Sequence, residues 1–193
     1  MDREYEARLV ARAASGETDA FREVFEAHHA AMFRFAYRLT SAADAAEDIT
    51  QECFLRLIGR PAFESGRGSL RLYLYGIVRN LVRQHQQANG REVHWDDDTD
   101  EGVSSGASLP DPVASAEVTA VVQSAVAALP PLQREAIVLC EFEELSLDEV
   151  AAIVGADVGT VKSRLHRARE GLRRSLAPYR GHGRLTAPKG TTL

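Results

Sequence analysis

The segment from Ser146 to Arg174 has the pattern of two short helices joined by a tight turn. Ser146 and Glu149 have the spacing of a capping box, in which a hydroxyl and a carboxylate satisfy the free backbone N–H groups at a helix start. Gly155 falls where the first helix must end, because glycine readily adopts the left-handed conformation found there. Asp157 is placed to cap the following helix. The spacing therefore predicts a helix, a sharp turn and a second helix.

Both halves of this segment carry apolar residues at helical spacing, which gives each helix one face to bury. The first stripe consists of Leu147, Val150, Ala151 and Val154, and the second of Val158, Val161, Leu165, Ala168 and Leu172. The other faces of the second helix are cationic, since residues 160–174 contain six basic residues and one acidic residue. A short helix packed across a basic helix is the helix-turn-helix arrangement, whose second helix enters the DNA major groove. A charged face is often only solvated, but charge of nearly one sign favours DNA binding.

The net charge of −5 at first argues against DNA as a partner. However, Glu92 to Glu117 contains eight acidic residues and no Lys or Arg, and the local field rather than the net charge decides where a polyanion docks. The same stretch is rich in Gly, Pro, Ser and Asp with little apolar periodicity, which predicts a flexible linker extended by self-repulsion.

The linker divides the chain into two expected helical domains. We predict domains at residues 1–88 and 117–180, a linker at residues 89–116 and a disordered tail at residues 181–193. No segment shows the alternating pattern of strands. The predicted fold class is therefore all-α, with two small helical domains joined by a flexible acidic linker and a helix-turn-helix in the second.

Composition excludes several other classes of protein. No run of about 18 apolar residues predicts a membrane span, and the acidic N-terminus lacks an apolar signal core, so we expect a cytoplasmic protein. Cys53 and Cys140 are solitary, which favours core packing over a disulfide or zinc. The adjacent His28 and His29 point to different helix faces, a poor metal geometry. Without a glycine-rich phosphate loop, a nucleophile elbow or a metal cluster, we expect no enzyme, no metal and no cofactor.

The first expected domain contains three helices with apolar stripes. One stripe runs from Phe21 to Leu39, with Asp19 as the expected cap, and the next helix covers residues 43–58. The polar residues of this second helix are Asp44, Glu47, Asp48, Gln51 and Glu52, and its inward residues are Ile49, Cys53, Phe54, Leu57 and Ile58. Positions 44, 48, 51 and 52 share one side. Spacing leaves open whether this side binds a partner or is solvated.

The third helix of this domain is expected over residues 69–87. Its apolar side consists of Tyr73, Leu74, Ile77, Val78 and Leu81, and its polar stripe of Asn80, Arg83, Gln84 and Gln87, with Arg79 beside it. A stripe of Arg, Asn and Gln without an acid can contact phosphates and base edges. Tyr73 and Tyr75 flank it, and aromatic rings can stack on unpaired bases. An amphipathic helix with a wet polar face would show the same pattern.

These residues resemble the extracytoplasmic-function (ECF) group of bacterial sigma factors, the subunits that bring RNA polymerase to promoters. The resemblance covers residues 21–87 and 128–174, and its motifs occur in the expected order across the linker. The motifs are DAAEDITQECF (44–54), LRLYLYGIVRN (70–80), ALPPLQRE (128–135), SLDEVA (146–151) and GTVKSRLHRAR (159–169).

The resemblance implies roles that spacing alone does not supply. The clamp of core polymerase is expected to bind Asp44, Asp48, Gln51, Glu52 and Phe54. The loop at residues 59–69 and the helix after it are expected to read the −10 element, with a base flipped out of the stack, through Tyr73, Arg79, Asn80, Arg83, Gln84 and Gln87. The −35 element is expected to meet Thr160, Lys162, Ser163, Arg164, His166 and Arg167. The implied partners are core RNA polymerase, through its clamp and flap, promoter DNA and an anti-sigma factor, and the linker would thread toward the RNA exit path.

Two positions depart from the family pattern. Tyr73 stands where relatives usually carry Trp, and Gly76 stands where a basic residue is common. Glycine in mid-helix costs about 1 kcal/mol relative to alanine. The alternative is a helix-turn-helix repressor or activator that binds duplex DNA on its own. It explains residues 146–174 equally well, but explains neither the Asn/Arg/Gln stripe of the first domain nor the acidic linker.

Overall fold

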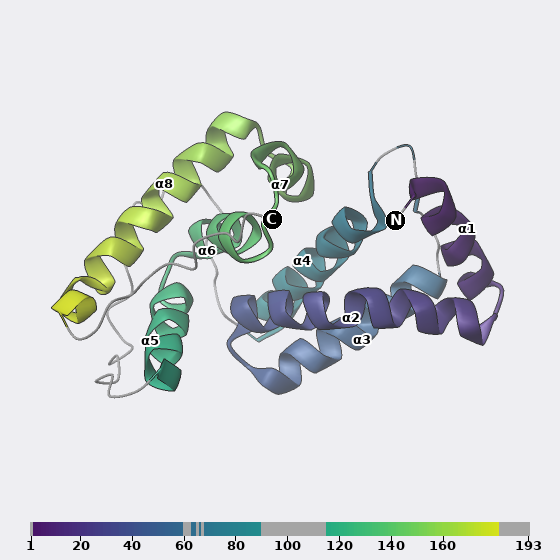
Figure 1. Cartoon of the computed structure of the whole chain (residues 1–193), viewed down its shortest axis with the longest axis horizontal. Helices are drawn as coiled ribbons and strands as arrows, with labels where there is room; N and C mark the ends of the chain where they lie inside the picture. The colour runs from purple at the N-terminus through teal and green to yellow at the C-terminus, as the bar shows by residue number, and fades with distance from the viewer. Residues whose placement is uncertain (1, 60–62, 65, 67, 90–114, 182–193) are drawn as a thin grey trace, which may run out of the picture.

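The computed structural model describes residues 2–59, 63, 64, 66, 68–89 and 115–181, and Figure 1 shows their arrangement. This part of the chain contains helices and no strand, so the all-α prediction is confirmed. The helices are α1 (Arg3–Ala14), α2 (Thr18–Thr40), α3 (Ala43–Gly59), α4 (Leu70–Ala88), α5 (Ser115–Ala127), α6 (Pro131–Ile137), η2 (Val138–Phe142), α7 (Leu147–Val154), α8 (Val158–Ser175) and η3 (Ala177–Gly181). The predicted acidic linker and C-terminal tail lie outside the described residues, apart from Asn89, Ser115, Ala116 and Gly181.

Helices α1 to α4 pack around an aromatic core. Phe35 and Tyr75 meet edge to face with ring centroids 5.1 Å apart, and Phe25 lies 4.9 Å from Phe54. Phe35 and Tyr75 are fully buried, and Phe54 is 2% exposed. Because each aromatic side chain buries a large apolar area, this cluster holds α2, α3 and α4 in fixed positions and so places their outer faces.

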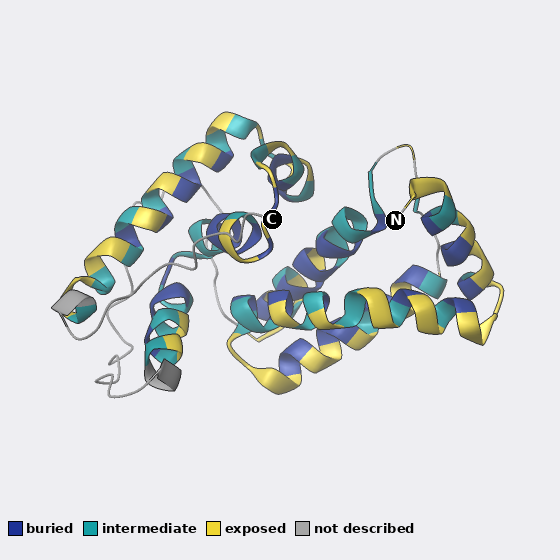
Figure 2. Cartoon of the chain, viewed as in Figure 1, coloured by how far each residue is buried: buried dark blue, intermediate teal, exposed yellow. Residues whose placement is uncertain are grey.

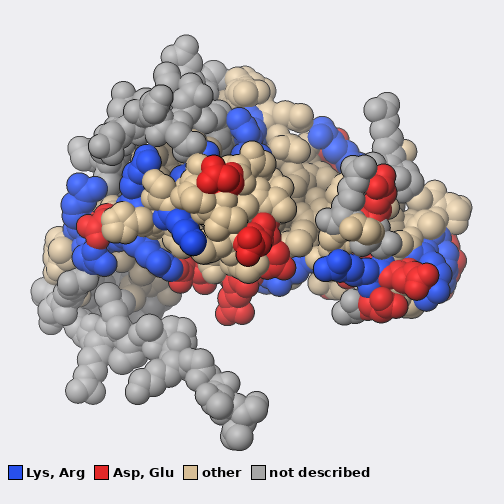
Figure 3. Space-filling view, turned by 90° about the horizontal axis from the view of Figure 1, so that it is seen from above, with Lys and Arg blue, Asp and Glu red and all other residues tan. Residues whose placement is uncertain are grey.

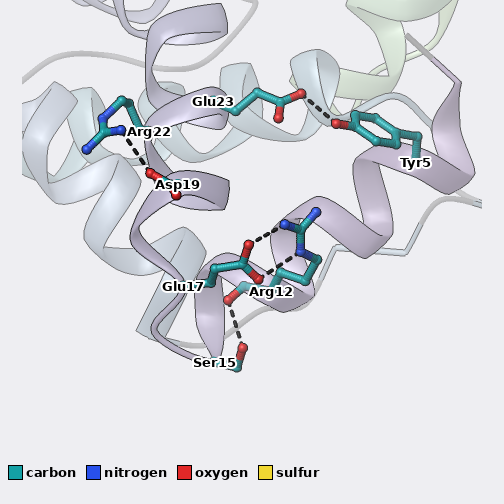
Figure 4. Close-up of polar contacts among 7 residues, drawn as sticks. All are labelled: Tyr5, Arg12, Ser15, Glu17, Asp19, Arg22 and Glu23. Carbon is teal, nitrogen blue, oxygen red and sulfur yellow. Dashed lines mark hydrogen bonds and ion pairs between the residues drawn. The ribbon is translucent and has the colours of Figure 1, made fainter.

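The start of the chain differs from the sequence-based expectation. Helix α1 was not predicted, and the cap assigned to Asp19 is wrong. Helix α2 begins at Thr18 with Glu17 as its N-cap, so Asp19 lies in the first turn and pairs with Arg22 at 2.9 Å. Figure 4 shows this pair beside the contact of Arg12 with Glu17. A difference of two residues in the helix start moves the Asp19 carboxylate from the capping position into the first turn of the helix.

Helix α1 also supports the start of α4. The Glu6 carboxylate, which is buried, accepts a hydrogen bond from the Leu70 backbone N–H at 2.9 Å. Ser69 caps the same end by accepting from the Leu72 N–H. The first N–H groups of a helix have no partner within the helix, so Glu6 satisfies one of them across 64 residues of sequence.

The second domain contains the predicted helix pair. The Ser146 backbone N–H donates to the Glu149 carboxylate at 2.8 Å, and the Glu149 N–H donates to Ser146 Oγ, which completes the capping box. Gly155 ends α7 at φ 66° and ψ 38°, in the left-handed region, and Asp157 Oδ1 accepts from the Thr160 N–H at 2.8 Å. The predicted caps and turn are confirmed.

The two domains pack directly against each other. Helix α4 contacts α7, and α2 contacts α5, α6 and η2. Figure 2 shows buried stretches on the sides of these helices and exposed residues along the outer sides of α3 and α8. The contact between domains decides which of the predicted binding residues reach solvent.

Candidate nucleic-acid interface

Helix α8 presents most of the predicted −35 residues to solvent. Lys162 and His166 are exposed, and Thr160, Ser163 and Arg167 are half-buried. Arg167 donates to Ser163 Oγ at 2.9 Å. Figure 3 shows Lys and Arg side chains gathered over the part of the surface formed by α8. The first turns of this helix therefore carry donors on a solvent-facing side, which is the part of a recognition helix that reaches base edges.

Arg164 differs from the other predicted −35 residues. It is 8% exposed, and its charge lies close enough to act on Glu135 of α6. Residue 164 lies beside the apolar stripe of α8. Its side chain is therefore turned toward α6 rather than toward solvent. The expected place of this side chain on the exposed face of α8 is therefore corrected, and its contact with DNA stays a prediction.

The polar stripe of α4 is divided between solvent and the domain interface. Asn80, Gln84 and Gln87 are exposed, and Arg83 is half-buried. Arg79, expected beside this stripe, is instead buried, and its Nε donates to Glu135 at 2.9 Å. The stripe prediction is thus corrected at Arg79, because the second domain covers this edge of the helix.

A cavity of about 460 Å³ opens at the start of α4, close to the predicted −10 loop. Its lining includes Phe63 and Tyr73, whose ring centroids lie 5.7 Å apart, and Asn80. Ala152 and Ile153 of α7 line the opposite side. The volume falls in the range of small-molecule sites. The two rings are tilted by 48° to each other, and a ring face beside an amide is suited to holding a planar base.

The outer face of α3 carries the acidic residues predicted to bind polymerase. Asp44, Asp48 and Gln51 are exposed, and half-buried Glu52 pairs with Arg56 at 2.8 Å. The inward position expected for Phe54 from its spacing is confirmed, and its contact with polymerase stays a prediction. Its side chain is 2% exposed and packs in the aromatic core.

Leu55 is the apolar side chain that this face does present, at 59% exposure. Leu55 was not among the residues predicted from the sequence. It follows Gln51 by four residues and Asp48 by seven, the spacing of one helix side, and an apolar residue at such a position is a signal that could have identified it. It also lines a cavity of about 610 Å³ with Glu52 and Asn80, which connects this face to α4.

A second buried carboxylate, Glu143, joins the domains. It follows η2 and is 3% exposed. The Tyr75 hydroxyl donates to its Oε2 at 2.6 Å, Arg38 pairs with its Oε1 at 3.0 Å, and Arg71 donates to its backbone oxygen at 2.6 Å. Burial, together with the bond to Glu143, raises the pKa of Tyr75 to about 12. The expectation that Tyr75 flanks the stripe and stacks on bases is therefore wrong.

Glu135 is the centre of a cluster of arginines. It is 2% exposed, and burial raises its pKa, while the charges of Arg79, Arg83 and Arg164 act in the opposite direction. Among the described residues its Oε2 has no hydrogen-bond partner. Three of the arginines predicted to meet DNA thus converge on one carboxylate. Glu135 follows Leu132 by three residues and precedes Leu139 by four, the spacing of an apolar helix side, and this is the sequence signal that was missed.

The described residues contain no group of three or more His, Cys, Asp or Glu side chains that could hold a metal ion. Cys53 is buried and Cys140 is half-buried, and both are free thiols. None of the helices described here is long and apolar enough to cross a lipid bilayer.

Comparison with known proteins identifies the family. The model for sigma-70 region 2 matches residues 24–92, and that for region 4 matches residues 119–172. The chain is 33% identical over 171 residues to the ECF RNA polymerase sigma factor SigW of Bacillus subtilis, covering 83% of this chain and 91% of that protein. This chain belongs to the ECF sigma factors.

Two further similarities agree. The ECF sigma factor SigE of Mycolicibacterium smegmatis is 34% identical over 160 residues, which is 81% of this chain and 62% of that protein. The sigma factor RpoE of Bartonella quintana, solved in complex with the anti-sigma factor NepR, superposes with a TM-score of 0.64 at 32% identity, covering 81% of this chain and 96% of that chain.

The protein is therefore an alternative sigma factor, which binds core RNA polymerase and directs promoter recognition and transcription initiation. Sigma factors are initiation factors. The region 2 match covers the Asn/Arg/Gln stripe of α4, which the alternative of a stand-alone helix-turn-helix regulator left unexplained. Helix α1 lies outside both matched ranges.

Proposed function

We propose that this sigma factor divides its task among three surfaces. The outer face of α3 binds the clamp of core polymerase, the exposed part of the α4 stripe with its cavity reads the melted −10 element, and the first turns of α8 read the −35 element. Residues 1–88 then form the polymerase-binding and −10 domain, and residues 117–180 form the −35 domain. The protein supplies binding surfaces and no catalytic group of its own.

One observation supports the assignment of polymerase binding to the outer face of α3. Asp48, Gln51 and Leu55 project from one side of α3 while the neighbouring Phe54 is locked in the core. An exposed leucine amid acidic and amide side chains gives the mixture of an apolar anchor and a polar rim that protein interfaces use. In the same way, Lys162 and His166 are exposed on a helix whose start is fixed by Asp157.

A charge-reversal experiment tests the α3 surface. The variant Asp48→Arg with Glu52→Arg is expected to abolish binding to core polymerase and leave folding intact, because exposed substitutions usually change stability by about 0.5 kcal/mol or less. The matched control is Glu4→Arg with Glu26→Arg, which reverses two exposed acidic residues on α1 and α2. Wild-type affinity for core in the first variant, or equal loss in both, contradicts the assignment.

The partners follow from the same proposal. RpoE of Bartonella quintana was solved with an anti-sigma factor, and we propose that an anti-sigma factor also controls this chain. A protein that works on polymerase and the chromosome acts in the cytoplasm. The test is run-off transcription with core polymerase and this chain, repeated with the purified candidate inhibitor. An inhibitor that leaves transcription unchanged at saturating concentration is not the partner.

A further inference from the structure

We propose that Glu6 of α1 is a positioning residue for recognition of the −10 element. Its carboxylate holds the first turn of α4 in place and thereby sets one wall of the cavity of about 460 Å³. This role depends on the proposed function of that cavity as the −10 site. It goes beyond that function because it gives α1, which lies outside both matched ranges, a part in promoter reading.

The side chain of Glu6 makes a buried contact that joins α1 to the start of α4. The Leu70 backbone N–H donates to Glu6 Oε2 at 2.9 Å, and the two residues are 1% and 5% exposed. A buried backbone donor without a partner is unfavourable, because water cannot replace the lost acceptor. A carboxylate at a helix start also lies at the positive end of the helix dipole. The Leu70 N–H therefore keeps its place only while Glu6 supplies the acceptor.

Leu70 lies between residues that line the cavity. Gly68 and Ser69 precede it, and Tyr73 follows within the same helical turn. Gly68 has φ 149°, a conformation that residues with a Cβ atom rarely adopt, so the chain turns just before the anchored N–H. The Tyr73 N–H donates to the Ser69 carbonyl at 3.2 Å, a bond that shapes this turn from within. The contact with Glu6 fixes the turn relative to the rest of the domain.

Helix α1 is well held, so that Glu6 has a fixed place from which to act. It packs against α2, α3 and α4. The Tyr5 hydroxyl donates to Glu23 at 2.8 Å, and Arg12 contacts Glu17 at the start of α2, as Figure 4 shows. A binding site recognises its ligand accurately only when the groups that line it have rigid support. Through Glu6, α1 provides that support for the end of α4 that carries the cavity.

The expected effect of losing Glu6 is confined to the −10 site. The exposed donors of α8 belong to the second domain, and Asp48 projects from the outer face of α3. A residue with a purely structural role would lower the amount of folded protein. Transcription from every promoter would then fall by the same factor, and the preference among −10 sequences would not change. This preference therefore distinguishes positioning from general stability.

The test uses the full-length protein with core polymerase and a promoter library randomised across the −10 element. Glu6→Leu removes the acceptor at similar size, and Glu6→Gln keeps an acceptor oxygen. The matched control Glu4→Leu removes an exposed acid from the same turn of α1. We expect Glu6→Leu to lower the preference for the best −10 sequence about tenfold, as the loss of one buried hydrogen bond would, and Glu6→Gln to stay within about threefold of wild type. Glu4→Leu should leave the preference unchanged.

Two further measurements complete the test. The affinity for core polymerase and the preference across a −35 library should match the wild type in all three variants. An unchanged −10 preference in Glu6→Leu, or an equal loss of transcription from every promoter, overturns the role of Glu6.

Tyr73→Ala tests the proposed function separately, because it removes a ring from the cavity itself. A wild-type −10 preference in this variant means that the cavity is not the −10 site, and the proposed function then fails at this surface. A changed preference in Tyr73→Ala, with none in Glu6→Leu, overturns only the role of Glu6.

A second variant serves if Glu6→Leu does not fold, which circular dichroism and thermal melting would reveal. Glu6→Asp keeps the negative charge but withdraws the acceptor oxygen from the Leu70 N–H by the length of a methylene group. Its −10 preference should fall about threefold, since the hydrogen bond weakens with distance. Amide hydrogen exchange in the first turn of α4, followed by mass spectrometry, should be faster than in wild type. Wild-type preference and wild-type exchange in Glu6→Asp overturn the proposal.

Discussion

The two domains hold their binding surfaces in place by different means. In the first domain, α3 and α4 surround rings such as Phe35 and Phe54, so their outer faces are fixed by aromatic packing. In the second, α7 and α8 are joined through Gly155 and bury aliphatic side chains such as Val161 and Leu165, and both helix starts are capped. We therefore expect core substitutions in the first domain to weaken polymerase binding most. In the second domain, we expect recognition of DNA to depend on the helix ends and on the exposed donors.

The largest effect is expected at Phe54. Phe54→Ala removes a buried ring whose centroid lies 4.9 Å from that of Phe25, and should lower the free energy of unfolding by about 3–5 kcal/mol. The neighbouring Leu55→Ala should change it by about 0.5 kcal/mol or less, because Leu55 is 59% exposed, and should weaken core binding about tenfold. Denaturant unfolding and a core-binding titration check both. Equal destabilisation by the two variants would contradict the conclusion that aromatic packing holds α3 in place.

The second prediction separates base reading from backbone contact on α8. Arg167→Ala, in the early turns, should cost about 1–3 kcal/mol at one promoter position and relax discrimination there. Arg174→Ala, at the exposed far end, should weaken all sequences about equally and lower the salt slope by at most about one unit. In vitro transcription across a −35 library measures both. Equal, sequence-independent losses would mean that the early turns do not read bases.

The third prediction concerns the turn. Gly155 has φ 66°, a conformation that costs residues with a Cβ atom about 1–2 kcal/mol. Gly155→Ala should therefore lower the stability of the second domain by about 1 kcal/mol. Gly155→Asn is the control and should cost less, since Asn tolerates the left-handed region. Thermal melts of both variants give the answer, and indistinguishable melts would show that the turn does not depend on this backbone conformation.

The smallest effect is expected at Gly76, with the opposite sign. A Cβ atom added there meets no atom within 4 Å, and the residue lies in mid-helix of α4. Gly76→Ala should therefore raise the free energy of unfolding by about 0.5–1 kcal/mol. The control Gly59→Ala stands at the last residue of α3, where the helix propensity of alanine gains less. A destabilising Gly76→Ala would mean that α4 needs its glycine for more than helix formation.

Local features were predictable from the sequence because they depend on residues a few positions apart. The capping box of Ser146 with Glu149, the left-handed Gly155 and the Asp157 cap all follow from neighbours within one or two helical turns. The apolar stripes of α7 and α8 follow for the same reason. Helix α1 was missed although it has local signals of the same kind, since Asp2 caps it, Glu4 and Glu6 lie in its first turn, and Leu9, Val10 and Ala13 are buried.

The candidate sites were predictable as faces but not residue by residue. Arg79 and Asn80 are neighbours about 100° apart around α4, yet Asn80 is exposed and Arg79 is buried against Glu135. Helical periodicity places both near the polar stripe. Only the second domain, which brings Glu135 from 56 positions later in the chain, separates them.

The sequence by itself determined the all-α class, the helix-turn-helix and the family, because capping, periodicity and motifs depend on residues that are close together in the chain. The tertiary structure alone decided that Tyr75, Arg79 and Arg164 are buried where the two domains pack together. The physical reason is that burial of a polar or aromatic side chain depends on which partner packs against it. That partner comes from a distant part of the chain, so no local pattern encodes it.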